Sequence, residues 1–167
     1  VANAEGIIFG LKGIKNVGLA ALQNIFAERA KKPFTDLFDF CKRVDLRTAN
    51  KRVLESLAYS GALDCLPGNR AQKIAELDKI IDMAHEHKEA EKTGQMGLFG
   101  GPAPDVTKPE TDSGYIFAPL PEMSDKIKLE KEREIVGFYL SSHPLKTFPI
   151  ISWLEHTSFL DALAMAK

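Results

Sequence analysis

The stretch Ile-Lys-Asn-Val-Gly at residues 14–18 comes directly before a predicted helix, where a backbone can bind a phosphate group. The first N–H groups of a helix have no acceptor within the helix, and the helix dipole adds partial positive charge at that end. Gly18 leaves room for a close approach, and Asn16 tolerates positive φ. We therefore predict that Asn16, Val17 and Gly18 form a phosphate-binding turn.

The spacing of these residues partly matches a helix-hairpin-helix, whose usual turn reads hydrophobic-x-Gly-hydrophobic-Gly. Asn16 replaces the first glycine of that pattern. Lys12 and Lys15 flank the turn and could reach neighbouring phosphates as point charges. Such contacts read no bases and weaken with salt. An ordinary helix start that contains glycine is the alternative, and this stretch alone does not decide between the two.

A second basic turn, at residues 44–52, precedes another predicted helix. Arg47, Lys51 and Arg52 cluster there. Hairpins of this kind commonly occur in pairs, so the second turn favours the DNA-binding interpretation. The alternative is a solvated helix face.

A different chemistry is indicated by Met96, Leu98 and Phe99, which lie in a segment unsuited to burying them. Ten of residues 93–125 are Gly or Pro, so no helical period can persist there. We expect a partner protein to bury the three side chains, with Gln95 at the rim and Gly97 keeping the backbone adaptable. The alternative is that they fold back onto their own core.

The elements that position these residues are predicted to be mostly α-helical. A short strand or a buried entry segment is expected at residues 7–11. Helices are expected at 18–32, at 35–44 with Thr35 as its cap, at 49–59 ended by Gly61, at 69–92 capped by Asn69 and Gln72, at 124–140, and over part of 150–167.

Composition is that of a globular protein, with 44% apolar and 27% charged residues. Residues 1–73 carry 12 Lys/Arg and 7 Asp/Glu, a balance of +5, and the remainder carries 10 and 16, a balance of −6. The basic half is the candidate surface for a polyanion. No apolar run suggests a membrane span, and Cys41 and Cys65 are expected to be reduced thiols in a cytosolic protein.

The usual catalytic and metal-binding patterns are not matched. In HEHKE, at residues 85–89, the second histidine falls at the wrong position for a zinc helix. The serines and histidine of residues 141–144 have no triad partner. Glu130, Glu132 and Glu134 alternate with Lys and Arg and are expected to be solvated. We predict no catalytic residue, metal or cofactor.

Five blocks follow one another along nearly the whole chain: GLKGIKNVG, VDLRTANKRVLESLAYSGALD, GNRAQ, QMGLFG and KLEKEREIVGFYLSSHPL. In order and spacing they resemble landmarks of the bacterial replicative DNA polymerase III alpha subunits. The resemblance implies a piece that carries a tandem helix-hairpin-helix, follows the fingers and lacks the catalytic palm. It also implies a clamp-binding pentapeptide, at Gln95, Met96, Gly97, Leu98 and Phe99.

The resemblance implies three partners: duplex DNA bound through its phosphates, the sliding clamp, and the rest of the polymerase III holoenzyme. It also implies a bacterial cytoplasmic protein associated with the nucleoid. We expect a DNA-binding helical domain at 1–92, a clamp-binding segment at 93–125, and a helix with a lead-in to an oligonucleotide-binding domain at 126–167. A stand-alone helix-hairpin-helix repair factor and a helical protein-interaction scaffold are the alternatives.

Overall fold

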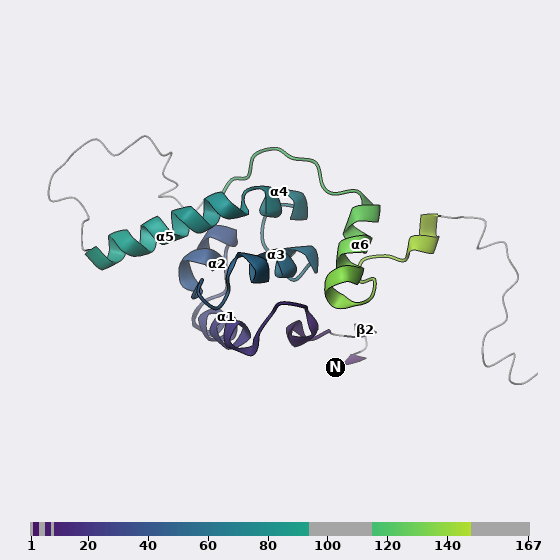
Figure 1. Cartoon of the computed structure of the whole chain (residues 1–167), viewed down its shortest axis with the longest axis horizontal. Coiled ribbons are helices and arrows are strands. Elements are labelled where there is room, and N and C mark those ends of the chain that lie inside the picture. Colours follow the sequence, from purple (N-terminus) through teal and green to yellow (C-terminus); the bar gives the residue numbers. More distant parts are fainter. Residues whose placement is uncertain (1, 4–5, 8, 94–114, 148–167) are drawn as a thin grey trace, which may run out of the picture.

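The computed structural model describes residues 2–3, 6–7, 9–93 and 115–147. In these ranges the regular secondary structure is helical apart from two strands of two residues each, so the predicted mostly α fold is confirmed (Figure 1). The elements are β1 (Ala2–Asn3), β2 (Gly6–Ile7), η1 (Leu11–Gly13), α1 (Leu19–Lys31), α2 (Leu37–Arg43), α3 (Lys51–Tyr59), α4 (Arg70–Ala75), α5 (Leu77–Thr93), α6 (Asp125–Val136) and η2 (Pro144–Thr147).

Of the two alternatives for residues 7–11, the strand is wrong for residues 9–11. β1 and β2 pair antiparallel, with Ala2 opposite Ile7. Leu11 instead begins the 3₁₀ helix η1, and its side chain packs against the helical core. A five-residue strand needs a neighbour of similar length for its hydrogen bonds, and the described ranges contain none.

One apolar core joins α1, α2, α3 and α5, and the end of α6 also contributes to it. On each helix the buried residues recur three or four positions apart, which places them on one face. The buried apolar residues of these five helices are Ala21, Leu22, Ile25, Leu37, Phe40, Cys41, Val53, Leu54, Leu57, Ala58, Leu77, Ile80, Ala84, Leu129, Ile135 and Val136. α6 therefore packs against this helical core.

The cap of α2 is Asp36, so the prediction of Thr35 was wrong by one residue. The Asp36 carboxylate accepts the N–H of Asp39 at 2.8 Å. In return, the Asp39 carboxylate accepts the N–H of Thr35 at 3.2 Å. A carboxylate also interacts favourably with the helix dipole, which a hydroxyl does not.

The predicted caps on either side of the α3–α4 loop are confirmed. Asn69 and Gln72 form a reciprocal capping box at the start of α4. Gly61, just past the end of α3, has φ +79. A Cβ on Gly61 would lie 2.3 Å from the guanidinium of Arg70, so both its backbone and the packing require glycine.

The predicted single helix over residues 69–92 is wrong, because it is interrupted at Glu76. The Glu76 carboxylate accepts hydrogen bonds from the Tyr115 hydroxyl and, at 2.7 Å, from the Ala118 N–H. The hydrogen bond from Tyr115 contributes most to lowering the pKa of Glu76. Residues 115–123 thus lie along α4, and Gln72 and Asn69 donate to the carbonyls of Ala118 and Leu120, each at 2.8 Å.

Glu132 is fully buried, so the prediction that it is solvated was wrong. Its carboxylate forms an ion pair with Arg70 at 2.8 Å, and Arg70 also pairs with Asp64 at 2.7 Å. The other Glu132 oxygen accepts the N–H groups of Leu140 at 2.8 Å and Ser141 at 2.9 Å. Burial alone would raise the pKa of Glu132, but these donors lower it.

These bonds to Glu132 also explain why α6 ends earlier than predicted. α6 stops at Val136, and Gly137 takes φ +98 as a left-handed cap. The chain then turns back, which brings residues 140 and 141 to the Glu132 carboxylate. The predicted end at Leu140 was therefore wrong by about one turn.

Lys73 lies on α4, and its side chain is buried against the loop between α3 and α4, with a relative exposure of 1%. Its ammonium group donates to the carbonyls of Leu63 at 3.0 Å, Leu66 at 2.9 Å and Gly68 at 2.6 Å. These three acceptors satisfy all three ammonium hydrogens. Burial nevertheless lowers the pKa of Lys73.

Both cysteines are free thiols, and burial raises the pKa of Cys41 to about 12. Of the helices in the described part of the chain, none is both apolar and long enough to span a bilayer.

Candidate nucleic-acid interface

The predicted phosphate-binding turn lies between η1 and α1. Ile14 and Val17 are buried in the core, with relative exposures of 5% and 8%. Lys15, Asn16 and Gly18, which alternate with them, are exposed. The two apolar side chains therefore anchor the turn, and its polar edge faces solvent.

Asn16 adopts φ +67, the only positive φ of a non-glycine residue in the described ranges. Its side-chain amide donates to the hydroxyl oxygen of Ser56 at 3.0 Å. Ser56 lies on α3, and its hydroxyl donates to the carbonyl of Arg52 at 2.9 Å. Sequence reasoning predicted the backbone conformation of Asn16 but missed Ser56.

The N-terminus of α1 presents backbone donors that no side chain caps. The N–H groups of Gly18, Leu19 and Ala20 have no acceptor within the helix. All three residues are exposed, and the Leu19 side chain has a relative exposure of 58%. These donors are free to bind an anion at the positive end of a helix of 13 residues.

Gly18 has an ordinary extended backbone, with φ −77 and ψ 159. A Cβ built on it meets no atom within 4 Å. Neither its backbone nor its own neighbours therefore require a glycine at this position. A ligand that approaches the turn closely would supply such a requirement.

Two other amides of the turn already have acceptors. The N–H of Lys15 donates to the carbonyl of Ile135, at the end of α6, at 3.0 Å. The N–H of Val17 donates to the carbonyl of Ile14 at 3.3 Å. The turn is thus held from α3 by a side chain and from α6 by the backbone.

The second predicted turn has a different chemistry, because its amides are satisfied internally. Asp45 accepts the N–H of Arg47 through its carboxylate and those of Thr48 and Ala49 through its carbonyl. Asn50 then caps α3 through the N–H of Val53 at 3.1 Å. This turn can contact a polyanion through side chains but offers few free backbone donors.

The basic side chains of the second turn differ in their availability. Lys51 forms an ion pair with Asp78 at 2.7 Å, and this partner raises the pKa of Lys51. Arg47 and Arg52 are exposed. Arg52 is one helical turn before Ser56, so it lies on the side of α3 that holds the first turn.

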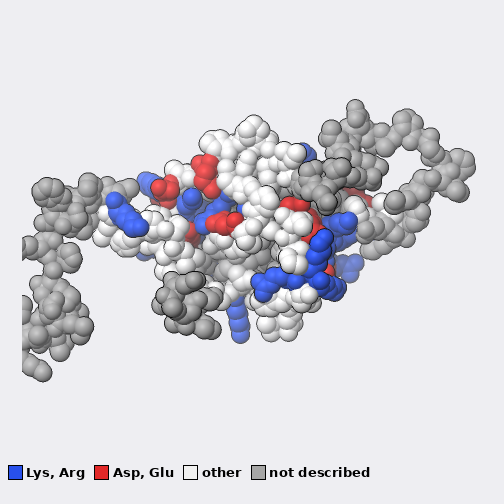
Figure 2. Space-filling model, turned by 180° about the vertical axis from the view of Figure 1, so that it is seen from behind, with Lys and Arg blue, Asp and Glu red and all other residues white. Residues whose placement is uncertain are grey.

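Lys and Arg side chains gather on one face of the molecule, at about the height of α1 in Figure 1 (Figure 2). Not every basic residue of the described chain is available to a ligand. Arg43 donates to the carbonyls of Glu28 and, at 2.6 Å, of Lys32, and so caps the end of α1. Its guanidinium also lies 4.5 Å from the centre of the Phe34 ring. Arg43 is therefore part of the scaffold.

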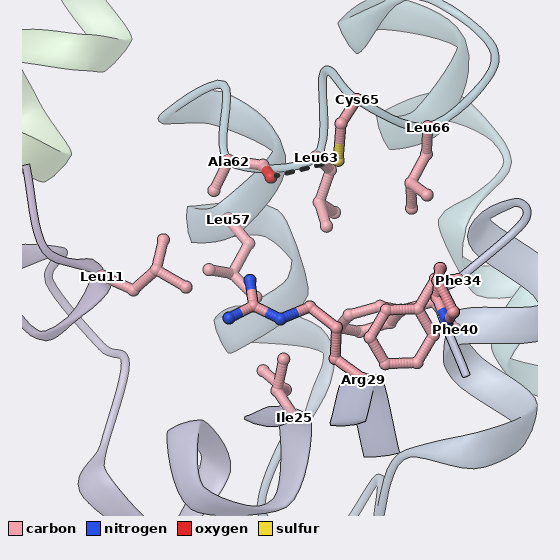
Figure 3. A pocket seen from close by; sticks show the side chains of 11 residues that line it. Leu11, Ile25, Arg29, Phe34, Phe40, Leu57, Ala62, Leu63, Cys65 and Leu66 are labelled. Carbon is pink, nitrogen blue, oxygen red and sulfur yellow. Dashed lines mark hydrogen bonds between the residues drawn. The ribbon is translucent and has the colours of Figure 1, made fainter. Parts of the chain in front are cut away.

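An apolar cavity of about 190 Å³ lies beside α1 and α3 (Figure 3). It is lined by Leu11, Ile25, Arg29, Pro33, Phe34, Phe40, Leu57, Ala62, Leu63, Cys65 and Leu66. Apart from Arg29 it presents no charged group. It is separate from the amide donors of the turn and shares no residue with the predicted site.

The predicted clamp-binding residues, Gln95 to Phe99, lie outside the described residues. The nearest described element is α5, which ends at Thr93. Within the described ranges no cluster of His, Cys, Asp and Glu could hold a metal ion.

Comparison of the sequence with known proteins finds a motif and a group of relatives. A family model described as "Helix-hairpin-helix motif" matches residues 1–73. DNA polymerase III subunit alpha of Vibrio cholerae serotype O1 is 39% identical over 143 residues, which is 85% of this chain. The same subunit of Caulobacter vibrioides is 39% identical over 169 residues and covers 100% of the chain. That of Bacillus subtilis is 40% identical over 146 residues and covers 84%.

The likeness extends beyond the helix-hairpin-helix region, because these alignments cover most of the chain. The alignments take up 12%, 14% and 12% of the three relatives. The chain therefore corresponds to about an eighth of the length of each of these relatives.

Proposed function

Because this chain belongs to the family of DNA polymerase III alpha subunits over the segment that it covers, we propose that it grips duplex DNA without reading sequence. The observation that carries this proposal is the uncapped N-terminus of α1, where Gly18, Leu19 and Ala20 present free N–H groups beside Lys15. Amides and lysines in this arrangement suit phosphate oxygens and make no use of base edges.

The two turns have separate roles in this proposal. The first binds a phosphate through its backbone, with Lys12, Lys15, Asn16 and Val17 forming or flanking the turn. The second adds charge through Arg47 and Arg52. Lys51 contributes less, because Asp78 already neutralises it.

Fluorescence anisotropy tests this proposal: a labelled DNA duplex of arbitrary sequence is titrated with the 167-residue chain. We expect weak binding at 50 mM salt, with the same affinity for duplexes of different sequence. The logarithm of the binding constant should fall linearly with the logarithm of the salt concentration. Binding that is absent at low salt, or that depends on sequence, would refute the proposal.

We also propose that residues 95–99 bind the sliding clamp. The proposal is supported by the match of QMGLF to the clamp-binding pentapeptide and by the direction of α5. Lys88 donates to the carbonyl of Val44 at 2.6 Å, near the end of α2, and α5 continues beyond it to Thr93. The helix thus leads away from the core, and its last residue, Thr93, directly precedes the segment 94–100 in the sequence (Figure 1).

Titration against purified clamp tests the second role. Leu98→Ala with Phe99→Ala should abolish binding, because two apolar anchors are removed, and should leave the helical circular dichroism unchanged. Ile116→Ala is the matched control, since Ile116 is an apolar side chain with a relative exposure of 83% outside the pentapeptide. Unchanged affinity in the double variant would contradict the clamp assignment.

For the longer protein we propose the activity of a DNA-directed DNA polymerase within the polymerase III holoenzyme. The present segment would hold DNA and clamp while residues elsewhere perform nucleotidyl transfer. The 167-residue chain alone should therefore not extend a primed template in the presence of Mg²⁺ and nucleotides. Primer extension by this chain would refute the proposal that nucleotidyl transfer is performed by residues elsewhere.

A further inference from the structure

Ser56 is a buried polar residue on the apolar side of α3, with a relative exposure of 2%. Its hydroxyl has one hydrogen to donate, and the carbonyl of Arg52 accepts it at 2.9 Å. The lone pairs of the same oxygen remain available, and the Asn16 side chain donates to them at 3.0 Å. Ser56 is thus a direct side-chain link between α3 and the predicted phosphate-binding turn.

This link has a conformational consequence because Asn16 has φ +67. Glycine reaches that region without penalty, whereas a residue with a Cβ does so at a cost of roughly 1 kcal/mol. A hydrogen bond that exists only in this conformation offsets a cost of that size. The side chain of Asn16 and the hydroxyl of Ser56 together do what a glycine would do at this position.

We propose that Ser56 is a positioning residue for DNA binding, which holds the turn of residues 14–18 in the conformation that presents its amides. The inference rests on the proposed DNA-binding function. Without the link, the turn would occupy other backbone conformations for part of the time. The apparent affinity for DNA would then be the intrinsic affinity multiplied by the fraction of molecules in the binding-competent conformation.

The same hydroxyl also connects the turn to the backbone of a basic residue, Arg52. Ser56 and Arg52 are four positions apart on α3, so they share one face of the helix. Arg52 therefore lies on the side of α3 that holds the first turn. One phosphate can be bound by the amides while a neighbouring phosphate meets the guanidinium.

The test compares Ser56→Ala with Ser60→Ala by duplex anisotropy at low salt, using the 167-residue chain. Ser60 is a matched control, since it is 6% exposed and its hydroxyl donates to the carbonyl of Leu57 at 3.0 Å without touching the turn. We expect Ser56→Ala to weaken DNA binding about fivefold, the equivalent of one hydrogen bond, and Ser60→Ala to leave it unchanged.

A rescue experiment separates positioning from simple destabilisation. Asn16→Gly removes the need for the link to Ser56, because glycine adopts positive φ without help. In that background Ser56→Ala should have little further effect, so the two changes should be strongly non-additive. Unfolding in urea gives the folded fraction of every variant.

The outcomes distinguish this inference from the function on which it rests. If the unchanged protein does not bind DNA, the proposed function fails and the inference fails with it. If the unchanged protein binds and Ser56→Ala binds equally well, only the positioning role is refuted. A loss of binding in Ser60→Ala of the same size, or additive effects of Asn16→Gly and Ser56→Ala, would also refute it.

Discussion

Replacement of Gly18 by alanine separates the needs of the fold from the needs of a ligand. The backbone of Gly18, with φ −77 and ψ 159, is one that alanine adopts freely, and the added methyl meets no atom within 4 Å. Alanine is a poorer helix cap than glycine, but it also reduces the entropy of the unfolded chain. The net change in the free energy of unfolding should be below about 1 kcal/mol.

The effect on DNA binding should be larger. The methyl carbon extends about 1.5 Å beyond Cα, beside donors that must come within about 2.9 Å of a phosphate oxygen. Loss of one such charge-assisted hydrogen bond costs about 1.5–3 kcal/mol. Because about 1.4 kcal/mol corresponds to a factor of ten, Gly18→Ala should weaken binding by roughly tenfold to a hundredfold.

Gly10→Ala is the control for this prediction. Gly10 has φ −78 and ψ 137, precedes η1, and likewise has no atom within 4 Å of a built Cβ. Anisotropy should show weaker DNA binding for Gly18→Ala alone, while urea unfolding of the two variants should be similar. Equal affinity of Gly18→Ala and the unchanged protein would refute the phosphate-binding role of this turn.

Three further predictions concern the basic side chains and the scaffold. Arg52→Ala should reduce the salt slope of DNA binding by about one, while Lys51→Ala should have a smaller effect because of its pairing with Asp78. Glu132→Gln should lower the free energy of unfolding by about 2–3 kcal/mol at pH 7, because it weakens the buried pair with Arg70. Since the folded-state pKa of Glu132 is lowered, its contribution is present at neutral pH and is lost as pH falls through that pKa. Urea titrations at several pH values should therefore show a shallower acid decline in Glu132→Gln. Gly68→Ala should lower the melting temperature more than Gly137→Ala does. Both glycines have positive φ, but only a Cβ on Gly68 would lie 2.6 Å from the Phe117 ring. Equal melting temperatures of the two variants would contradict this prediction.

The features that the sequence predicted well depend on residues a few positions apart. The capping box of Asn69 and Gln72 is complete within three residues, and its side-chain chemistry is unambiguous. Asn16 and Gly61 have positive φ. Few residue types tolerate such a backbone in a turn, so the residue types themselves indicated the conformation. These local rules also predicted the helical fold, since apolar spacing marks the buried face of each helix.

The features that the sequence did not predict depend on partners far along the chain. Glu132 is bound to Arg70, 62 residues away, and Glu76 to Tyr115, 39 residues away. Alternation with Lys and Arg makes Glu132 look solvated, because the pattern contains no information about a distant guanidinium. The contact of Ser56 was also not predicted, although its position indicates one. A lone hydroxyl within the apolar stripe of an amphipathic helix requires hydrogen-bond partners.

The loop between α3 and α4 encloses an amine that reagents in solution cannot reach. Lys73 gives all three of its ammonium hydrogens to carbonyls of this loop, so an acylating reagent has no access to its nitrogen while the loop is closed. Exposed amines such as those of Lys12 and Lys15 would be acylated in the same sample without delay. The rate at which Lys73 is labelled would therefore measure how often this loop opens, independently of any ligand.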